Sequence, residues 1–422
     1  MFSVSVNRIA LISVDGDPAA EIGQEEAGGQ NVYVRQVGQA LAQQGWQVDM
    51  FTRKTSPTQP AIVEHSANCR TIRLVAGPQE FMNRDRLFSH LPEFVQAFQI
   101  FQHQQGIQYP LVHTHYWLSS WVGMQLKRHQ PLTQVHTYHS LGAVKYQSIS
   151  KLPEIADTRL AVEKACLETV DCVIATSPQE EQQLRTLVSS KGQIYMIPCG
   201  TDLERFGRVS RLTARHHLGI DPYAPVVLYV GRFDPRKGIE TLVRAAARSQ
   251  FCHYGLQLII GGGSRPGQSD GLERERIENL VTSLGLADCT EFPGRLDETL
   301  PLYYAAADVC VVPSHYEPFG LVAIEAMASR TPVIASQVGG LQFTVIPQVT
   351  GLLVPPKDDT ALAIAMDQVL SSPNWRNQMG EAGRMRAEIA FGWNSVASRM
   401  SQLYSTLLSQ PSFAHKPTPV AA

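Results

Sequence analysis

Short apolar segments of strand length alternate with amphipathic segments of helix length along nearly the whole chain of 422 residues. A helix between two strands returns the chain to the same end of a sheet, so this alternation predicts an α/β fold with parallel sheets. The pattern restarts in the second half, and the length favours two domains, each a doubly wound Rossmann-like sheet. The expected strands are residues 9–14, 47–52, 71–75, 111–114, 135–138 and 173–176, then 225–231, 256–260, 290–292, 309–313, 332–335 and 352–354.

A turn-rich stretch, Pro198–Phe206, separates the two halves and suits a linker. We expect a first domain of residues 1–204 and a second of residues 205–392. A final helix at 393–409 is expected to pack back on the first domain, and residues 410–422 to form a flexible tail. Doubly wound sheets bind ligands beyond the carboxyl ends of their strands. Two facing domains would therefore form a central cleft with one substrate on each side.

The composition excludes several classes of protein. The formal net charge is −2 and basic tracts are absent, which argues against a nucleic-acid partner. Apolar runs are too short to span a bilayer, and the first strand follows Arg8 so closely that no signal peptide is expected. The seven cysteines lack CxxC spacing, which indicates buried thiols in a reducing cytoplasm.

Two carboxylates, Glu317 and Glu325, lie eight residues apart around a turn that contains Pro and Gly. A predicted strand ends just before the turn, and a helix begins at Leu321. A helix N-terminus with free N–H groups can bind an anion, and the carboxylates can accept hydrogen bonds from adjacent hydroxyl groups. A nucleotide-sugar offers both groups. By itself, the pair also fits a surface helix whose acidic residues complement the helix dipole.

Three further turns follow strands of the second half and should lie along the same sheet edge. Arg232 and Lys237, in the turn 231–238, could neutralise a diphosphate, although such a turn can also be a solvated surface loop and Lys237 can also be a structural ion-pair partner. The turn around Gly262 lets a ligand or the facing domain approach the backbone. The backbone beside Arg295 could pair with the edge of a nucleobase, although an exposed Arg295 is the simpler interpretation.

In the first half, Gly28 and Gly29 begin a helix and leave N–H groups directed at the expected cleft. Gln30 can donate and accept hydrogen bonds, which suits a polyhydroxy acceptor; an ordinary glycine-rich helix cap is the alternative. The preceding Asp15-Gly16-Asp17 is interpreted as a solvated loop.

Four histidines lie near two adjacent strand ends of the first half. Alternation directs His113 and His115 to one side and His136 to the other. Acidic or cysteine partners with metal-ligand spacing are absent, so His113 and His136 are expected to pack or hydrogen-bond in the core, and no metal site is expected. His139 ends its strand and should face the cleft.

The second half resembles the donor domain of retaining glycosyltransferases with the GT-B fold, in particular glycosyltransferase family 4. The segments GRFDPRKG, GGG, PGRL and EPFGLVAIEAMA carry this resemblance. It implies that Arg232 and Lys237 hold the donor diphosphate and that Glu325 binds the ribose hydroxyls. It also implies that Glu317 and the backbone of residues 319–321 hold the sugar and the distal phosphate. The implied donor site contains Gly29, Arg232, Lys237, Gly262, Arg295, Glu317, Glu325 and the backbone of Phe319, Gly320 and Leu321.

The first half resembles sucrose-phosphate synthases. The segments AGGQNVYV and HTHYWLSSW are shared more widely, including with transferases that use inositol phosphate and tend to carry Met where this chain has Gln30. The run His139–Gly142 with Lys145 is closer to sucrose-phosphate synthases than to sucrose synthases. The resemblance implies that His139 contacts the donor sugar. The implied acceptor site contains Gly29, Gln30, Lys145, Arg159 on the acceptor phosphate, and Arg84 and Arg86 closing over the same group. The family pattern has Lys in that last loop, and a solvated loop is the alternative for Arg84 and Arg86.

The resemblance implies transfer of glucose from UDP-glucose to fructose 6-phosphate, with His139, Arg232, Lys237 and Glu317 as catalytic residues and without a metal or other cofactor. The acceptor hydroxyl would attack from the side of the leaving group, with double displacement through Glu317 as the competing mechanism. The plant relatives carry a phosphatase-like extension that this sequence lacks, so a separate phosphatase is expected to act on the product. Free fructose and inositol phosphate are alternative acceptors, and an epimerase or a UDP-sugar sensor is an alternative function.

Overall fold

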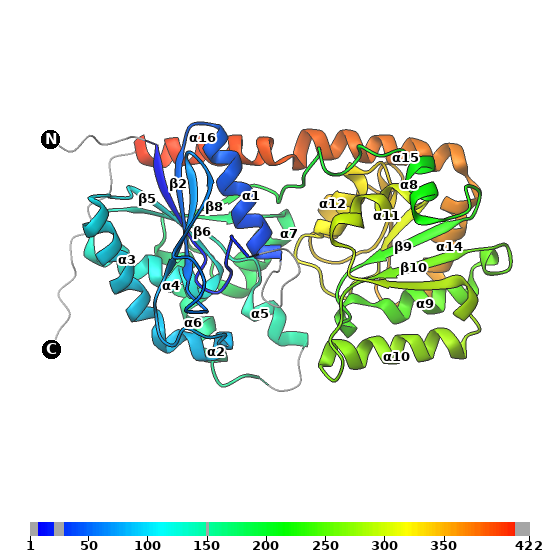
Figure 1. Ribbon diagram of the computed structural model, residues 1–422, viewed down its shortest axis with the longest axis horizontal. Coiled ribbons are helices and arrows are strands. Elements are labelled where there is room, and N and C mark those ends of the chain that lie inside the picture. The colour runs from blue at the N-terminus through cyan, green and yellow to red at the C-terminus, as the bar shows by residue number, and fades with distance from the viewer. Residues whose placement is uncertain (1–6, 21–28, 149–151, 410–422) are drawn as a thin grey trace.

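The computed structural model describes residues 7–20, 29–148 and 152–409. These residues form two α/β domains that lie side by side, each with helices on both faces of its sheet (Figure 1). The predicted fold of two doubly wound domains is confirmed. The expected tail at 410–422 and Gly28 lie outside the described residues.

The first sheet has eight strands in the order β3-β4-β2-β1-β5-β6-β7-β8, and every pair is parallel except β3 with β4. Because β1 lies between β2 and β5, the strand order reverses at β1 and β5, and the ligand crevice of a doubly wound sheet is expected there. The strands are β1 (Arg8–Ile12), β2 (Gln47–Arg53), β3 (Ile62–Ser66), β4 (Cys69–Leu74), β5 (Leu111–His115), β6 (Thr133–Thr137), β7 (Cys172–Ala175) and β8 (Ile194–Met196).

Alternate residues of β1 pack into two separate clusters, as expected for a strand buried on both faces. Ile9 and Leu11 join the cluster formed with α1 (Gly29–Gln43) and α16 (Trp393–Ser409), whereas Ala10 and Ile12 join the cluster formed with α3 (Leu91–Gln105) and α4 (Tyr116–His129). The helices of this domain are α1 (Gly29–Gln43), α2 (Arg84–Leu87), α3 (Leu91–Gln105), α4 (Tyr116–His129), α5 (Gly142–Lys145), α6 (Ala156–Thr169) and α7 (Pro178–Gln183).

The second sheet has six parallel strands in the order β11-β10-β9-β12-β13-β14, so its order reverses at β9 and β12. The strands are β9 (Val226–Val230), β10 (Gln257–Gly261), β11 (Thr290–Gly294), β12 (Val309–Val312), β13 (Val333–Ser336) and β14 (Gly351–Val354). The helices are α8 (Arg211–Leu218), α9 (Ile239–Arg248), α10 (Ser269–Ser283), α11 (Leu300–Ala306), α12 (Leu321–Ala328), α13 (Leu341–Thr344), α14 (Asp359–Ser371) and α15 (Pro373–Arg386).

The last described helix, α16 (Trp393–Ser409), follows α15 of the second domain but packs on the first (Figure 1). The Trp46 indole N–H donates to Ser401 Oγ at 2.9 Å, and Tyr404 Oη is hydrogen-bonded to the buried His113 ring at 2.7 Å. The Thr201 N–H donates to the carbonyl of Phe391 at 2.6 Å, so the two segments that connect the domains touch. We propose domain limits near residues 204 and 392.

The sequence prediction missed β3 and β8. β3 has exposed and half-buried residues in alternation, and β8 has only three residues with two of them exposed, so neither has the apolar run of a buried strand.

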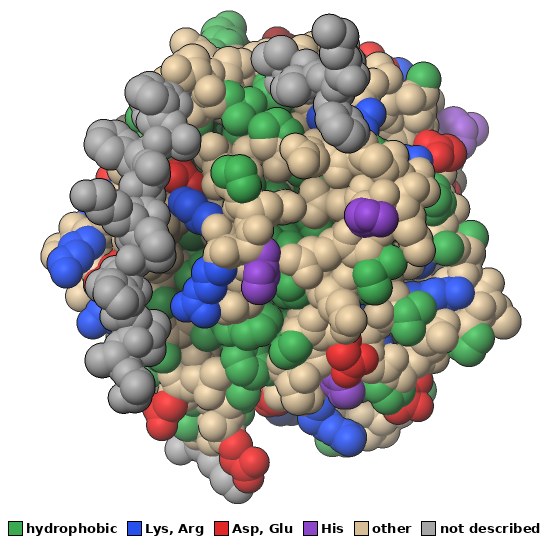
Figure 2. Space-filling view, turned by 90° about the vertical axis from the view of Figure 1, so that its left-hand side faces the viewer, with side chains coloured by type: hydrophobic (Ala, Val, Ile, Leu, Met, Phe, Trp, Pro, Cys, Tyr) green, Lys and Arg blue, Asp and Glu red, His purple; other side chains and the backbone are tan. Residues whose placement is uncertain are grey.

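Charges of both signs are interspersed on the described surface of the end of the molecule shown in Figure 2. Among the residues described, the helices all fall short of the length and apolarity that a membrane crossing needs.

Candidate active site

The two domains meet where their sheets reverse strand order. Gly29, at the start of α1, faces Leu321, at the start of α12: a Cβ added at Gly29 would lie 3.2 Å from Leu321 Cδ1. A second contact joins Tyr316 to Ser140, and burial raises the pKa of Tyr316 to about 12 while a hydrogen bond with Ser140 opposes this rise. The ends of β1 and β6 therefore lie opposite the end of β12, as a cleft between the two crevices requires.

The acidic turn after β12 is shaped by glycines. Gly320 has φ of 95° and caps α12, and a Cβ at Gly339 would lie 2.1 Å from the carbonyl oxygen of Glu317. The Gly340 N–H donates to that same carbonyl at 3.1 Å. The Phe319 side chain is buried against Phe391, with ring centroids 5.8 Å apart. Because its side chain is committed to the core, only the backbone of Phe319 remains for a ligand.

The two residues expected to act on the donor's sugar and phosphate are bonded to each other. Lys237 Nζ donates to Glu317 Oε2 at 2.6 Å, and Ser314 Oγ donates to the same oxygen at 3.3 Å. The loops dock because Gly238, with φ of 69°, lies against the backbone of Pro313, where a Cβ would come within 2.0 Å of the carbonyl oxygen. A cation and a carboxylate are thus held together at the crevice.

Arg232 follows β9 and is exposed. Within residues 7–20, 29–148 and 152–409, its guanidinium makes no hydrogen bond or ion pair, so it is available to an anion.

Glu325 lies half-buried on α12. The Tyr304 hydroxyl donates to its Oε2 at 2.8 Å. Burial raises the pKa of Glu325 to about 7, whereas the Tyr304 hydrogen bond and the positive charge of Arg205 act in the opposite direction. The carboxyl group therefore changes charge near neutral pH.

The turns after β9, β10 and β11 are joined by backbone hydrogen bonds. The Gly262 N–H donates to the Gly294 carbonyl at 2.8 Å, and the Gly231 N–H donates to the Gly261 carbonyl at 3.0 Å. A Cβ at Gly262 would lie 2.0 Å from the Gly231 carbonyl oxygen, so glycine is required there by the neighbouring turn. The Arg295 side chain is exposed, and its Nε donates to Asp297 at 2.6 Å.

A pocket of about 530 Å³ lies in the first domain beside the contact with the second, and three of the expected acceptor residues line it: Arg84, Lys145 and Arg159. Burial lowers the pKa of Lys145, and the charges of Arg159, Arg236 and Arg84 lower it further. These cations crowd around one space, which suits an anionic ligand. The rest of the lining is Asn83, Asp85, Tyr116, Trp117, Tyr146, Leu152, Pro153 and Glu154.

Arg159 is buried and firmly held. Its Nε donates to Glu163 at 2.7 Å and its Nη2 to the Ser140 carbonyl at 2.8 Å, while the Gly142 N–H donates to Glu163 at 2.9 Å. The Arg159 guanidinium lies 5.1 Å from the centre of the Tyr116 ring. The buried carboxylate offsets part of its charge and fixes its orientation at the pocket.

Arg84 and Arg86 are separated by the fold. Arg84 lies 5.1 Å from the centre of the Tyr116 ring, and its Nε is 2.8 Å from Asp15 Oδ2. Arg86 is exposed and lines a neighbouring pocket of about 420 Å³ instead. The two side chains diverge because residues two apart in a helix, such as Arg84 and Arg86 in α2, lie on different faces. The structure therefore brings Arg84, but not Arg86, to the pocket of Lys145 and Arg159.

The interpretation of residues 15–17 as a solvated loop is wrong. The Asp15 side chain is only 2% exposed, and Asp17 forms a buried ion pair with Arg73 at 2.7 Å. Gln30 Nε2 donates to Ser13 Oγ at 3.0 Å and to Asp15 Oδ1 at 3.3 Å. The aspartates are needed to fix the first-domain loop and Gln30.

The histidines divide between core and cleft. His113 and His136 are buried and hydrogen-bonded, to Tyr404 and Thr114 respectively, which confirms their expected core role. His139 is half-buried at the end of β6 with φ of 59°, and its Nε2 lies 3.0 Å from Nδ1 of His115. In the described part of the chain, no group of three or more His, Cys, Asp or Glu has the geometry of a metal site.

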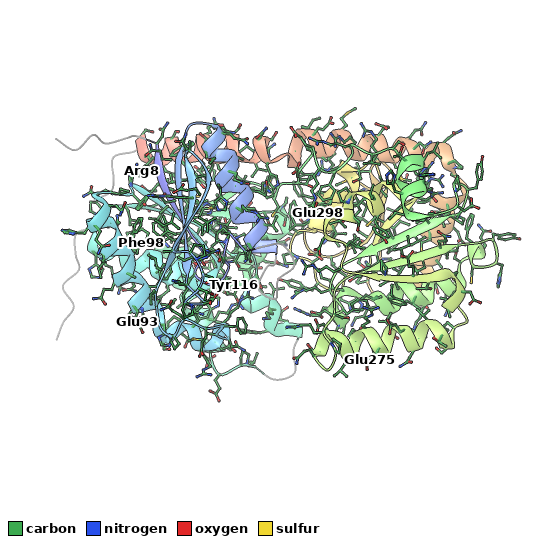
Figure 3. All side chains as sticks on the ribbon, in the orientation of Figure 1. Arg8, Glu93, Phe98, Tyr116, Glu275 and Glu298 are labelled. Carbon is green, nitrogen blue, oxygen red and sulfur yellow. The ribbon has the colours of Figure 1, made fainter. Side chains whose placement is uncertain are left out.

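Sequence reasoning missed three tyrosines. Tyr116 begins α4 with φ of 70°, lies beside both Arg84 and Arg159, and is on the side of the first domain nearer the second (Figure 3). Tyr304 holds Glu325, and Tyr316 joins the domains. Tyr116 directly follows the two histidines of its strand end, a position that could have marked it, but neither a positive φ nor these long-range contacts can be read from a sequence.

Two facing Rossmann-like domains, with a cation–carboxylate pair and a helix N-terminus at the cleft, define a GT-B glycosyltransferase. The family model "Glycosyltransferase Family 4" matches residues 27–205, and "Glycosyl transferases group 1" matches residues 210–386. The chain belongs to glycosyltransferase family 4 and is a retaining hexosyltransferase.

Individual relatives agree with this assignment. The chain is 56% identical to a sucrose-phosphate synthase from Thermosynechococcus elongatus of known structure, over 96% of this chain and 99% of that one, with a TM-score of 0.87. It is 36% identical to the D-inositol 3-phosphate glycosyltransferase of Corynebacterium urealyticum, over 96% of both proteins. The Anabaena protein HepE, in complex with UDP and glucose, shares the fold at 19% identity and a TM-score of 0.74 over 94% of this chain and 99% of that one.

Proposed function

We propose that this protein transfers glucose from UDP-glucose to fructose 6-phosphate and releases sucrose 6-phosphate and UDP. The observation that carries the proposal is the pocket of Arg84, Lys145 and Arg159 in the first domain, beside the contact with the acidic turn. Three cations around one pocket suit a phosphorylated acceptor better than free fructose. The 56% identity to a sucrose-phosphate synthase supports the sugar phosphate.

On the donor side, charge develops on the diphosphate as the bond to the sugar loosens. Arg232 and Lys237 lie beyond β9, where their charges would stabilise it, and the Gly29 N–H at the start of α1 would add to this. Glu325 would accept hydrogen bonds from the ribose. The acceptor hydroxyl attacks on the face of the leaving group, and a phosphate oxygen takes its proton, so the configuration is retained.

Transfer to inositol phosphate is the second candidate. The curated relatives at 36% identity carry that name, and the same cations would bind its phosphate. Gln30 favours fructose 6-phosphate, since the inositol-phosphate transferases tend to carry Met there.

UDP release from UDP-glucose tests the proposal in four separate assays: with fructose 6-phosphate, with fructose, with inositol phosphate and with no acceptor. We expect turnover with fructose 6-phosphate to exceed the others. Turnover with inositol phosphate but not with fructose 6-phosphate would favour the second candidate. UDP-glucose binding without turnover would identify a sensor, and conversion of UDP-glucose without UDP release an epimerase.

We propose further that Arg232, Lys237 and a helix terminus replace a metal at the diphosphate, and that a separate phosphatase acts on the product. Loss of activity in a chelator would contradict the first point. The seven free cysteines favour a reducing compartment such as the cytoplasm.

A further inference from the structure

The contact between His115 and His139 constrains where their hydrogens lie. His115 Nδ1 and His139 Nε2 are 3.0 Å apart. Burial lowers the pKa of His115 well below its ordinary value and that of His139 to about 3, so both rings are neutral near pH 7. A neutral imidazole has one N–H and one bare nitrogen. One ring therefore donates to the other through this contact, and two arrangements of the hydrogens are available.

The second nitrogen of His115 decides between them. His115 Nε2 is buried and has no hydrogen-bond partner within the described ranges. A hydrogen on Nε2 would leave a buried N–H donor unpaired, which is rare and costly in proteins, whereas a bare acceptor is tolerated more often. The hydrogen of His115 therefore lies on Nδ1 and is donated to His139 Nε2. The hydrogen of His139 must then lie on its own Nδ1.

We infer that His115 is a positioning residue that fixes the tautomer of His139, so that His139 meets its ligand with Nδ1–H as a donor. The inference rests on the proposed function in one respect, the contact between His139 and the donor sugar. His139 Nδ1 makes no hydrogen bond among residues 7–20, 29–148 and 152–409, and the side chain is half-buried. The ring itself is held by the edge contact with Tyr33, at 4.9 Å between centroids.

The consequence is a neutral donor of defined direction at the end of β6. Such a group hydrogen-bonds a hydroxyl oxygen of the sugar without giving up its hydrogen. The opposite tautomer would present a lone pair, and the sugar hydroxyl would then have to turn and donate its own hydrogen to the ring, which changes the direction of the hydrogen bond. Without His115, His139 could adopt either tautomer, and part of the population would be unproductive.

Nitrogen-15 NMR of the histidine rings, recorded without substrate, tests the tautomer directly. His139→Gln identifies the His139 signals by their loss. We expect His139 to be protonated at Nδ1 in the wild type and to populate the Nε2–H form in His115→Leu. Protonation at Nε2 in the wild type, or an unchanged tautomer in His115→Leu, would overturn the inference. Because the sample contains no substrate, the tautomer that NMR reports does not depend on whether the proposed reaction is correct.

Kinetics of matched variants provide the second test. Asn retains an N–H near the position of Nδ1, so His115→Asn should stay within about threefold of the wild-type kcat, while His115→Leu should lose about tenfold. His136→Asn is the control, because His136 bonds to Thr114 and not to His139. Equal losses in His115→Asn and His115→Leu would assign His115 a purely structural role. Circular dichroism at the assay temperature establishes that each variant is folded.

Discussion

Lys237 donates a hydrogen bond to Glu317 at 2.6 Å, between loops 80 residues apart in the sequence. The two groups are expected to contact the phosphate and the sugar of the donor, respectively. A donor phosphate must therefore compete with Glu317 for Lys237. The pair keeps the cation at the crevice and offsets the cost of desolvating both charges until the donor binds.

Replacement of Lys237 by Met should lower kcat by about 10²- to 10³-fold, because charge that develops on the leaving diphosphate loses its cation. The measurement is UDP release at saturating substrates. Lys164→Met, an exposed residue of α6, is the matched control and should retain the wild-type rate. An unchanged kcat in Lys237→Met would show that Lys237 is not a catalytic residue.

Glu317→Gln distinguishes the two routes to retention. If the acceptor attacks from the face of the leaving group, the variant should keep a measurable rate and give product with the same anomeric configuration. If Glu317 is the nucleophile of a double displacement, the transfer should be abolished. Single-turnover assays with NMR analysis of the product separate the two outcomes.

The affinity of the wild type for UDP should rise between pH 6 and pH 8, and this rise should be roughly ten times larger than the rise measured for Glu325→Gln. Ribose hydroxyls donate to the ionised carboxylate, and the pKa of Glu325 is about 7. Comparing the two proteins cancels the titration of UDP itself. Identical pH profiles in calorimetric titrations would contradict ribose binding by an ionised Glu325.

The carboxyl group of Glu325 also affects stability, and its raised pKa determines whether the unfolding free energy rises or falls with pH. The folded protein holds this proton more tightly than the unfolded chain, so its contribution is complete below about pH 4.5 and is lost as the pH rises towards 7. The unfolding free energy of the wild type should thus fall across this window relative to that of Glu325→Gln, which is measurable by urea titration.

Arg84→Ala and Arg86→Ala form a matched pair two residues apart. Arg84 lines the pocket of Lys145 and Arg159, and Arg86 does not. We expect Arg84→Ala to raise the KM for fructose 6-phosphate by about 10- to 100-fold, as loss of a charged hydrogen bond does, and Arg86→Ala to leave it within about twofold. An equal effect of both substitutions would mean that the α2 segment rearranges around the acceptor.

Gly262→Ala should destabilise the protein by about 1–3 kcal/mol, because the added methyl group meets the Gly231 carbonyl oxygen at 2.0 Å. Gly263→Ala is the control, since its Cβ would come no closer than 3.8 Å to Arg295. Thermal unfolding of the two variants measures the difference. Equal melting temperatures would show that the turn after β10 accommodates the added methyl group without loss of stability.

The sheet strands were predictable because buried parallel strands are continuous apolar runs, and α1 was expected because two glycines mark its start. β3 and β8 were not predictable, because edge strands need no such run. At the site, the sequence indicated chemistry but not pairing: Lys237 and Glu317 were both recognised, yet their mutual bond was not. Arg84 and Arg86 looked equivalent in the sequence, because their side chains point in different directions only once α2 has formed. The burial of Asp15 and Asp17 depends on arginines from distant segments, which local polarity conceals.

Helix α16 has a consequence for the order in which the chain folds. Val396, Met400 and Tyr404 complete the core that Ile9 and Leu11 begin. During synthesis, roughly 390 residues must emerge before this face of the first sheet can be covered. The first domain therefore completes this part of its core only after the second domain has been synthesised, and until then α1 is the helix that covers Ile9 and Leu11.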